Sequence, residues 1–493
     1  MKGSKKNCWV GTAFILYLLI APPATGAAFG PDEWLEYRMN DSNNPVFKQE
    51  GVEPLEATTF KTGDEIRSTP VVAGNRMFVG NHNSGEMYAF DIETGEQLWQ
   101  NQAPNWIHSE MIYHEGTVYV GFGNRFFQGN GLRGTEESGV MAVDAETGET
   151  KWQTSTGGEV MPTPVFNDGF VYAATGDRQV YKIEAESGDV VKEVDLGHVV
   201  SMSSPNFYEG KLFVGSGHPQ PYTFASIDLA SDNLAWQTEM PKAFAGLDDV
   251  PPAIEDDIVV TTSLEEQKQL SLKEVYEQYG LLEAYKEMGK SLTGDRKEHP
   301  EHVIYALDTE TGEVLWKETL GFGEMVKNNK SGAPMIYEGT VYVGSPITKK
   351  FYAYDLKTGE QLWDFQNTTM KAPPVADEGV VYFTNAKGFV HALDAETGEE
   401  IGRKKLGGTL APSGPIIMND TLIVGSQDSN VYALPTKEVR NGSDEFTADL
   451  EPPEKSQFSF LTVVYGIPLV TFVVLVTILI VAVRKSRKTK IER

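Results

Sequence analysis

Apolar and polar residues alternate in short segments that recur along most of the chain. Val303, Tyr305 and Leu307 show the two-residue period of a strand with one buried face. Asp308 follows, and its carboxylate can cap a tight turn, while Gly312 supplies the positive φ that a short hairpin loop requires. The pattern therefore predicts a strand, a tight turn and a second strand.

Seven copies of this hairpin are recognisable. They occupy residues 89–99, 142–152, 182–192, 226–236, 306–316, 353–363 and 392–402. Five copies end in a tryptophan at the same register, namely Trp99, Trp152, Trp236, Trp316 and Trp363. A large aromatic side chain at one position of each unit is expected to pack one unit against the next, so we interpret these tryptophans as structural.

A second pattern precedes each hairpin: a Pro-rich lead, an apolar strand, an acidic-Gly turn and another strand, as in residues 163–176 and 333–345. Each unit therefore contains four strands. Where consecutive copies keep the turn glycine, these glycines lie 39 to 53 residues apart. This period and this number of strands predict an all-β fold, the β-propeller.

Two fragments at the ends of the repeat region each lack part of a unit. Residues 56–66 look like the terminal strand of a blade, and residues 409–434 supply a Pro lead and strands without the outer Trp strand. Joining the two fragments in one blade closes the ring and removes the open strand edges. We therefore predict an eight-bladed propeller over residues 55–436 with a shared first and last blade.

The repeated run A-x-D-x-x-T-G-x-x-x-W resembles the repeat of the pyrroloquinoline-quinone-type β-propeller family. The resemblance implies the propeller fold. It leaves the function open, because that superfamily includes quinoprotein dehydrogenases and also cofactor-free scaffolds such as the propeller lipoprotein of bacterial outer-membrane assembly. We expect a non-enzymatic, membrane-anchored, archaeal-type member similar to the latter.

The N-terminal residues 1–27 have the organisation of a secretory signal peptide. Three lysines precede an apolar run from about Cys8 to Ile20, and small residues follow. This run is shorter than the roughly 20 residues that span a bilayer, and an uncleaved anchor is the alternative. Cys8 is the only cysteine, so the mature chain should carry no disulfide. In the N-terminal lead, residues 28–54, we expect Trp34 and Tyr37 to fold back onto the propeller flank.

The C-terminal part predicts a membrane anchor. Residues 437–457 are acidic, lack an apolar period and are interpreted as a linker. Residues 458–483 are mostly apolar and carry no charge, which predicts a transmembrane helix, and the basic residues 484–493 follow at once. The positive-inside rule places this basic tail in the cytoplasm. We therefore expect a single-pass protein of the cell membrane whose propeller lies on the extracytoplasmic side.

Two segments interrupt the blade pattern. Residues 121–139 are Gly-rich and are interpreted as a mobile surface loop, because the following helix and Lys-Ser/Thr pair of a phosphate-binding loop are missing. Residues 264–300 have an approximately helical apolar stripe. This helical insert is either a flap that packs on the propeller rim or a docking element.

The formal net charge of −28 argues against a nucleic-acid partner, because a surface this acidic repels phosphate backbones. Salt should relieve the self-repulsion of such a molecule. His82, His114 and His218 are scattered on blade loops without the spacing of a metal site, so we predict no metal.

Channel residues can be predicted from the Pro leads. Counting three residues back from each lead position gives Arg67, His108, Met161, Met202, Asp249, Ser331, Lys371 and Pro412, with Trp106 and Asp248 close by. We select Arg67, Trp106, His108, Asp249 and Lys371 as candidate ligand-binding residues at one channel mouth. The alternative is a polar channel without a ligand, and no catalytic residue is assigned.

The function predicted from the sequence is a cell-surface scaffold that binds or assembles proteins, or binds an unidentified ligand. Its partners are the membrane, through the C-terminal helix, and a protein at the cell surface. The resemblance also implies an alternative, a quinone-dependent oxidoreductase acting on alcohols or sugars. Pyrroloquinoline quinone and calcium are expected as cofactors only under that alternative.

Overall fold

The structure, a computed structural model, describes residues 28–328, 330–410 and 412–449, together with residues 466, 469, 472–478 and 480. The predicted signal peptide, the basic tail, residues 450–457 of the linker and most of the segment 458–483 lie outside the described residues. In the part of the chain that the structure covers, no helix combines the length and the apolar character that a membrane crossing requires.

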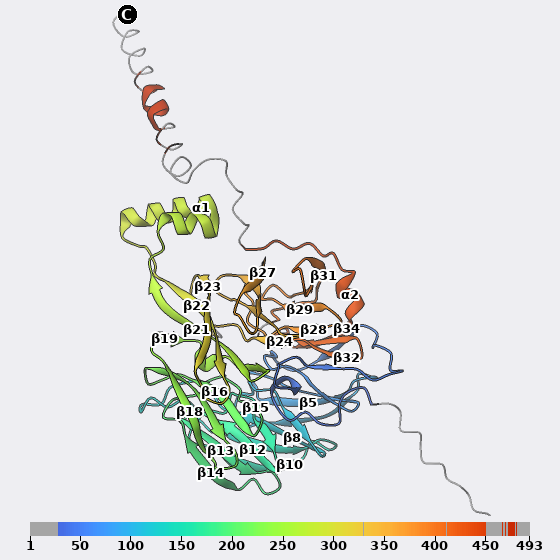
Figure 1. Ribbon diagram of the computed structural model, residues 1–493. Helices are drawn as coiled ribbons and strands as arrows, with labels where there is room; N and C mark the ends of the chain where they lie inside the picture. Colours follow the sequence, from blue (N-terminus) through green and yellow to red (C-terminus); the bar gives the residue numbers. More distant parts are fainter. Residues whose placement is uncertain are drawn as a thin grey trace, which may run out of the picture.

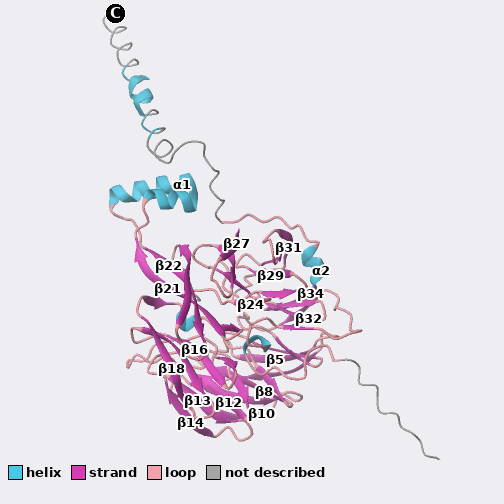
Figure 2. Cartoon of the chain, in the orientation of Figure 1, coloured by secondary structure: helices cyan, strands magenta, loops and turns pink. Residues whose placement is uncertain are grey.

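Eight sheets form a ring, which confirms the predicted eight-bladed propeller (Figure 1; Figure 2). We number the blades 1 to 8 in the chain order of their first strands. The first strands line the channel side: β3 (Val71–Ala73), β7 (Ile112–His114), β11 (Val165–Asn167), β15 (Asn206–Tyr208), β20 (Ala253–Glu255), β24 (Met335–Tyr337), β28 (Val375–Asp377) and β32 (Ile416–Met418). The second strands are β4 (Arg76–Gly80), β8 (Thr117–Phe122), β12 (Phe170–Ala174), β16 (Lys211–Ser216), β21 (Ile258–Lys268), β25 (Thr340–Gly344), β29 (Val380–Thr384) and β33 (Thr421–Gly425).

The third strands, largely buried like the second, are β5 (Glu86–Asp91), β9 (Gly139–Asp144), β13 (Gln179–Glu184), β17 (Tyr222–Asp228), β22 (His299–Asp308), β26 (Lys350–Asp355), β30 (Phe389–Asp394) and β34 (Asn430–Pro435). The outer strands are β6 (Gln97–Gln102), β10 (Thr150–Ser155), β14 (Val190–Asp195), β18 (Asn233–Met240), β23 (Val314–Phe322), β27 (Gln361–Gln366), β31 (Glu400–Lys405) and β2 (Thr58–Lys61). A short extra strand, β19 (Ala243–Ala245), pairs with β21 in blade 5.

The ring closes in blade 8, where strand β2 from the N-terminal end pairs with β34 from the C-terminal end. Thr58 lies opposite Ala433, and Lys61 lies opposite Asn430, in an antiparallel register. Phe60 is buried and packs against Phe90 of blade 1. The predicted shared blade is thus observed, and it removes the two strand edges that an open ring would expose.

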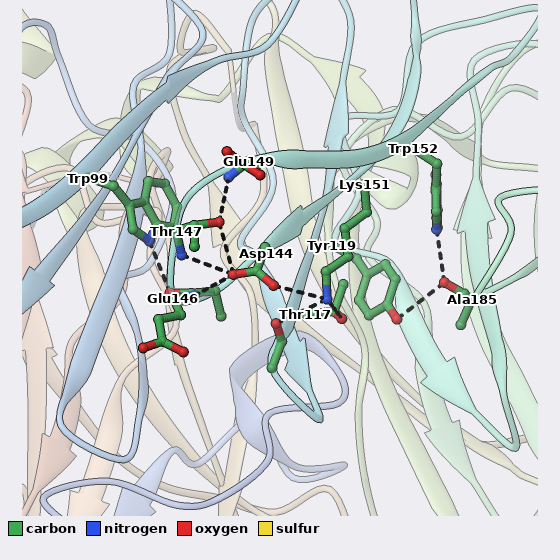
Figure 3. Close-up of polar contacts among 12 residues, drawn as sticks. Trp99, Thr117, Tyr119, Asp144, Glu146, Thr147, Glu149, Lys151, Trp152 and Ala185 are labelled. Carbon is green, nitrogen blue, oxygen red and sulfur yellow. Dashed lines mark hydrogen bonds and ion pairs between the residues drawn. The ribbon is translucent and has the colours of Figure 1, made fainter.

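The repeated turn and the tryptophan of the preceding blade act together to join neighbouring blades, as Figure 3 shows for blades 1 to 3. Asp144 Oδ1 accepts hydrogen bonds from the backbone N–H of Thr147 (2.9 Å) and from its hydroxyl (3.1 Å). Trp99 Nε1 of the preceding blade donates to Ala145 O (2.9 Å). Gly148 has a φ of 75°, and a Cβ there would lie 2.7 Å from the Trp99 ring. The turn therefore requires glycine for its conformation and also for its contact with the tryptophan.

The four other tryptophans of the repeat make the same hydrogen bond to the next blade. Their Nε1 atoms donate to the carbonyls of Ala185 (Trp152), Thr309 (Trp236), Leu356 (Trp316) and Ala395 (Trp363). Each ring also lies against the turn of the next blade, within 3 Å of the position that a Cβ would take at Gly188, Gly312, Gly359 or Gly398.

The N-terminal lead runs around one end of the channel, which corrects the expectation that it folds onto the flank. In chain order it forms a hydrogen bond with the first strand, or the turn after it, of all eight blades. The bonded pairs are Gly30–Gly74, Trp34–Tyr113, Leu35–Phe166, Glu36–Phe207, Asp41–Ile254, Ser42–Ile336, Asn44–Ala376 and Pro45–Ile417. After Pro45, strand β1 (Val46–Phe47) pairs in parallel with β32. We call residues 28–47 the strap.

Arg38 and Asn43 fix the strap across the centre of the ring. Arg38 is fully buried, and its Nη2 donates to Pro374 O (2.7 Å) and Pro415 O (2.8 Å). Asn43 Nδ2 donates to Pro252 O (2.8 Å) and Pro334 O (3.1 Å). Two polar side chains thus satisfy carbonyl groups of four blades. We call the end of the channel that the strap covers the closed face.

The predicted insert 264–300 begins and ends as strand, because β21 and β22 extend beyond the blade as a hairpin. Its helix, α1 (Leu272–Thr293), stands off the ring (Figure 1). Ser271 and Glu274 form a reciprocal capping box at its start, and Gly294 ends it with a φ of 77°. Gly280 has a non-helical backbone and divides the helix into two parts.

The described part of the predicted linker 437–457 belongs to the folded unit. Residues 437–440 lie in helix α2 (Thr436–Arg440), and residues 441–449 lie along blade 7. Arg403 N donates to Gly442 O (3.0 Å), and Phe446 packs edge-on against the buried His391 (ring centroids 4.8 Å apart). The acidic composition and the missing apolar period of this tail predicted a free linker. The contacts that order it could not be seen in its local sequence, because they are made with residues of blade 7.

Candidate functional site

The eight residues predicted to line the channel do line one cavity in the structure. Arg67, His108, Met161, Met202, Asp249, Ser331, Lys371 and Pro412 surround a chamber of about 50 Å³, and Tyr37 of the strap also lines it. Such a space holds a few water molecules, since one water needs roughly 10–15 Å³. Organic ligands occupy pockets of about 300–1,000 Å³, so this chamber is too small for one.

The chamber also contains a buried carboxyl that the sequence reasoning missed. Glu110 accepts a hydrogen bond from the backbone N–H of Arg38 (2.9 Å), and burial raises its pKa to about 7. Glu110 lies two residues after the channel residue His108 and just before strand β7. The signal available in the sequence was an ionisable side chain at position 110 among small and apolar neighbours.

Two loops lie over the other end of the channel. Arg125 of the Gly-rich loop 121–139 hydrogen-bonds Asn328, and Lys371 Nζ donates to the carbonyls of Lys327 (2.7 Å) and Asn328 (2.8 Å). The Gly-rich loop is also tied to blade 3, because Arg133 N donates to Gly176 O (2.9 Å). The loop predicted as a mobile surface excursion is therefore part of the channel mouth.

Beside these loops a cavity of about 420 Å³ opens to solvent, and we call it the mouth cavity. Its lining includes Arg125, Phe126, Phe127, Arg133, His218, Tyr222, Asp248, Asp249 and Lys330. Phe126 and Phe127 are 53 % and 56 % exposed. The Arg133 guanidinium lies 5.5 Å from the centre of the Phe127 ring, a cation–π contact.

Three carboxyl groups lie at or beneath the mouth cavity. Glu159 has no exposed surface and pairs with Arg133, whose Nε is 2.9 Å from Glu159 Oε1. Burial raises the pKa of Glu159 to about 8, against the opposing effect of Arg133. Burial and the neighbouring Asp249 raise the pKa of Asp248 to about 7. Glu159 and Asp248 therefore carry less than full negative charge near neutral pH.

Cations outnumber the ionised acids at this end of the channel. They are Arg67, Arg125, Arg133, Lys330 and Lys371. Burial and the nearby Arg67 lower the pKa of Lys371 to about 8, so it is still mostly charged at neutral pH. The same two causes lower the pKa of His82 to about 4, which keeps that imidazole neutral. A molecule with a net charge of −28 thus has a locally cationic mouth, which favours an anionic ligand.

Of the five candidate binding residues, four lie in the chamber and one lies apart. Arg67, His108, Asp249 and Lys371 line the chamber. Trp106 instead packs against His82 and Phe126, with ring centroids 5.0 and 5.4 Å apart. It therefore supports the aromatic side of the mouth.

The chamber does not fit a quinone with calcium. The chamber is too small for the quinone, and Trp106 lies outside it. Among the described residues, one group of three carboxylates is close enough to hold a cation, namely Asp377, Glu378 and Asp420. Lys48 Nζ already lies 2.8, 2.8 and 3.0 Å from these three side chains. The lysine supplies the positive charge there, and the cluster lies beside the strap, away from the mouth.

Comparison with known proteins identifies the family. The family model described as outer membrane protein assembly factor BamB matches residues 46–129, 122–267, 289–373 and 352–455. The chain belongs to the BamB family. The BamB of Burkholderia pseudomallei is 24 % identical over 389 residues, which cover 76 % of this chain and 85 % of that protein.

The similarity extends beyond proteins that carry the BamB name. A tetrathionate hydrolase from Acidithiobacillus ferrooxidans is 24 % identical over 475 residues, covering 86 % of this chain and 90 % of the relative. Among solved structures, BamB from Moraxella catarrhalis has a TM-score of 0.53 at 15 % identity and covers 77 % of this chain and 98 % of its own. The quinohemoprotein alcohol dehydrogenase of Comamonas testosteroni has a TM-score of 0.57 at 13 % identity and covers 84 % of this chain and 82 % of its own. These structural matches share the propeller fold.

Proposed function

We propose that this BamB-family protein is a membrane-tethered scaffold that binds a partner protein at the mouth cavity. The observation that carries the proposal is the combination of two exposed phenylalanines with three cations, Arg125, Arg133 and Lys330, in an otherwise acidic molecule. Aromatic and arginine side chains are the residues that most often dominate binding energy in protein interfaces. A partner segment with both apolar and acidic residues complements this surface.

The tether in this proposal is the segment 458–483. Its length, its lack of charge and the basic residues that follow support a single transmembrane helix with a cytoplasmic C-terminus. With residues 1–27 as a signal peptide, the propeller lies at the extracytoplasmic surface of the cell membrane. The relatives named as assembly factors support a protein as the partner.

The scaffold proposal is tested by binding of a defined probe. A fluorescein-labelled peptide that alternates aspartate and leucine is titrated with the full-length protein in detergent, and a lysine–leucine peptide serves as the charge control. We expect the substitutions Phe127→Ser and Lys330→Gln each to weaken binding of the acidic peptide about tenfold, which corresponds to roughly 1.4 kcal/mol. Val191→Ser and Lys192→Gln, which are exposed on the outer strand of blade 3, are matched controls. Equal binding of both peptides would contradict the proposal.

A second candidate function is hydrolysis of a small anion. It is favoured by the position of Asp248, whose raised pKa near 7 leaves it protonated part of the time beside cationic groups, in a cavity large enough for a substrate. The similarity to a tetrathionate hydrolase supports tetrathionate, a doubly charged oxyanion of sulfur, as the first substrate to test. Arg133 and Lys330 would bind the anion. Water would attack a sulfur atom as an S–S bond breaks and would release a proton to solvent, while Asp248 would donate a proton to the departing sulfur group.

The two candidates are separated by an activity assay. Under the enzyme hypothesis, the full-length protein consumes tetrathionate, and Asp248→Asn lowers the rate by roughly 10²-fold or more while the acidic peptide still binds. Under the scaffold hypothesis neither protein consumes tetrathionate. Turnover that is unchanged in Asp248→Asn would remove Asp248 from the proposed chemistry.

A further inference from the structure

Helix α1 presents apolar residues to solvent on the side that faces away from the propeller. Leu281, Leu282 and Leu292 are 36 %, 67 % and 89 % exposed. At 100° per residue these three side chains fall within an arc of about 100° on the second part of the helix. Exposed apolar groups gathered on one side of an element commonly mark a contact surface.

Other residues of α1 make contacts with the rim of the propeller or with the ends of the insert. Val275 and Ala284 are buried in a small apolar cluster with Leu270. The Tyr279 hydroxyl donates to Phe322 O (2.7 Å), and Glu287 pairs with Lys290 and Arg296. These contacts hold the helix to β23 and the hairpin of β21 and β22. They use none of the three exposed leucines.

The chain leaves the described fold beside this helix. Residues 441–449 follow blade 7, and the Asp449 carboxylate lies 2.6 Å from Lys387 Nζ. Asp449 also lines a cavity of about 210 Å³ together with Tyr279, Glu283 and Glu287 of α1. Only residues 450–457 separate this point from the proposed anchor, and a fully extended connection of this length spans at most about 30 Å. Helix α1 itself is about 33 Å long.

The helix and the mouth cavity lie on the same face of the ring. The Gly-rich loop at the mouth connects the second and third strands of blade 2, and α1 is inserted between the second and third strands of blade 5. Lys387, which holds the tail, lies in the corresponding connection of blade 7. The strap lies at the opposite end, where Gly74 connects the first and second strands of blade 1.

We propose that the exposed leucines of α1 lie in the interfacial layer of the membrane that holds the C-terminal anchor. This inference rests on the proposed anchoring of residues 458–483. The short connection brings α1 to the bilayer surface, and the outward apolar face matches a helix that lies in the plane of the interface. The mouth cavity then faces the bilayer, so the partner of the scaffold is a membrane-proximal segment of a membrane protein.

Site-specific labelling tests the proposal on the full chain. Cys8, the only cysteine, is replaced by serine, and single cysteines introduced by Leu282→Cys or Leu292→Cys carry an environment-sensitive nitrobenzoxadiazole label. The proteins are reconstituted in phosphatidylcholine vesicles with or without lipids that carry a nitroxide quencher in the acyl chain. Val191→Cys, beside the closed-face turn of blade 3, is the control. We expect blue-shifted emission and severalfold stronger quenching at 282 and 292 than at 191.

The outcomes separate this inference from the proposed anchoring. Protein that does not float with the vesicles would overturn both, because no anchor is then present. Protein that floats but shows the same weak quenching at all three positions would overturn the contact of α1 with lipid and leave the anchor intact. A blue shift without quenching would also overturn the lipid contact, because it would show that protein covers the leucines.

Discussion

Arg133 Nε lies 2.9 Å from Oε1 of Glu159, a carboxyl group without exposed surface. Burial nevertheless raises the pKa of Glu159 to about 8, and it raises the pKa of Glu36 in the strap to about 8 as well. The folded protein therefore binds these two protons more tightly than the unfolded chain. The stability gained from this proton binding is complete below a pH of about 4.5 and is lost as the pH rises through 8.

The first prediction is a fall in the free energy of unfolding between pH 6.5 and 8. Each of the two groups contributes about 1.4 kcal/mol per pH unit while its folded form stays protonated. At lower pH the buried His82 and His302 oppose this trend, because burial lowers their pKa values to about 4 and about 3. The unfolded chain then binds more protons at these two residues than the folded protein. Their contribution to the free energy of unfolding therefore rises with pH until the histidines of the unfolded chain are neutral, near pH 6.5. Urea unfolding at a series of pH values measures the slope.

The variant Glu159→Gln isolates one group in this profile. It removes the titration and keeps the shape of the side chain, so we expect a shallower slope above pH 6.5 than in the parent protein. The remaining slope comes from Glu36 and, near pH 7, from Glu110 and Asp248, whose pKa values are also raised by burial. A profile of unchanged slope would show that Glu159 is ionised at neutral pH and paired fully with Arg133.

A second prediction concerns the glycine turns. Gly95 and Gly148 occupy equivalent turns with φ values of 76° and 75°, but only Gly148 lies against a tryptophan, since nothing is within 4 Å of a Cβ at Gly95. Gly95→Ala should cost about 1 kcal/mol of stability through backbone strain. Gly148→Ala should cost roughly 1–3 kcal/mol more, because its Cβ would meet the Trp99 ring at 2.7 Å. Equal losses in denaturant titrations would show that the ring moves aside freely.

Much of the propeller was predictable because its repeat is local. The Asp and Thr of the regular turns bond within a few residues of one another, as Asp308 does with Thr311, so the turn is visible in a short stretch of sequence. The chamber residues could be predicted for a related reason, since each stands at a fixed distance from a Pro lead.

The strap and the mouth loops could not be predicted in this way. Arg38 bonds to Pro374 and Pro415, more than 300 residues away, and it does so through backbone carbonyls that every residue possesses. No pattern of side chains marks such partners. Glu159 likewise meets its ion-pair partner only in the folded protein, because Arg133 belongs to a loop inserted in another blade.

The third prediction tests the strap. Arg38→Met should lower the free energy of unfolding by about 2–4 kcal/mol, because it leaves two buried carbonyl groups without a donor. Lys48→Met is the control: Lys48 also binds several groups, yet its side chain is one-third exposed and the loss should be about 1 kcal/mol or less. Hydrogen exchange gives a local readout, and the amides of Ile254 and Ile336, which donate to the strap, should exchange faster in the Arg38 variant. Unchanged exchange at both would contradict the role of Arg38.

The fourth prediction concerns salt. With a net charge of −28, self-repulsion should destabilise the fold in dilute buffer, and screening should raise the thermal midpoint as salt increases toward the molar range. Binding of the acidic peptide at the mouth should change in the opposite direction, because salt screens its attraction to Lys330 and Arg125. A midpoint that does not depend on salt would show that the carboxylates are neutralised locally.

The path of the strap also sets an order of events during synthesis. Residues 28–47 are made before any blade, but their hydrogen-bond partners are made one blade at a time, and the last partner, Asn419, appears only near the end of the propeller. Blades can form as they are made, whereas the strap can complete its course only around a finished ring. A chain that stops inside blade 8 therefore leaves both β2 and the strap without their final partners. The unpaired N-terminal segment of such an incomplete ring would be accessible to quality-control proteases.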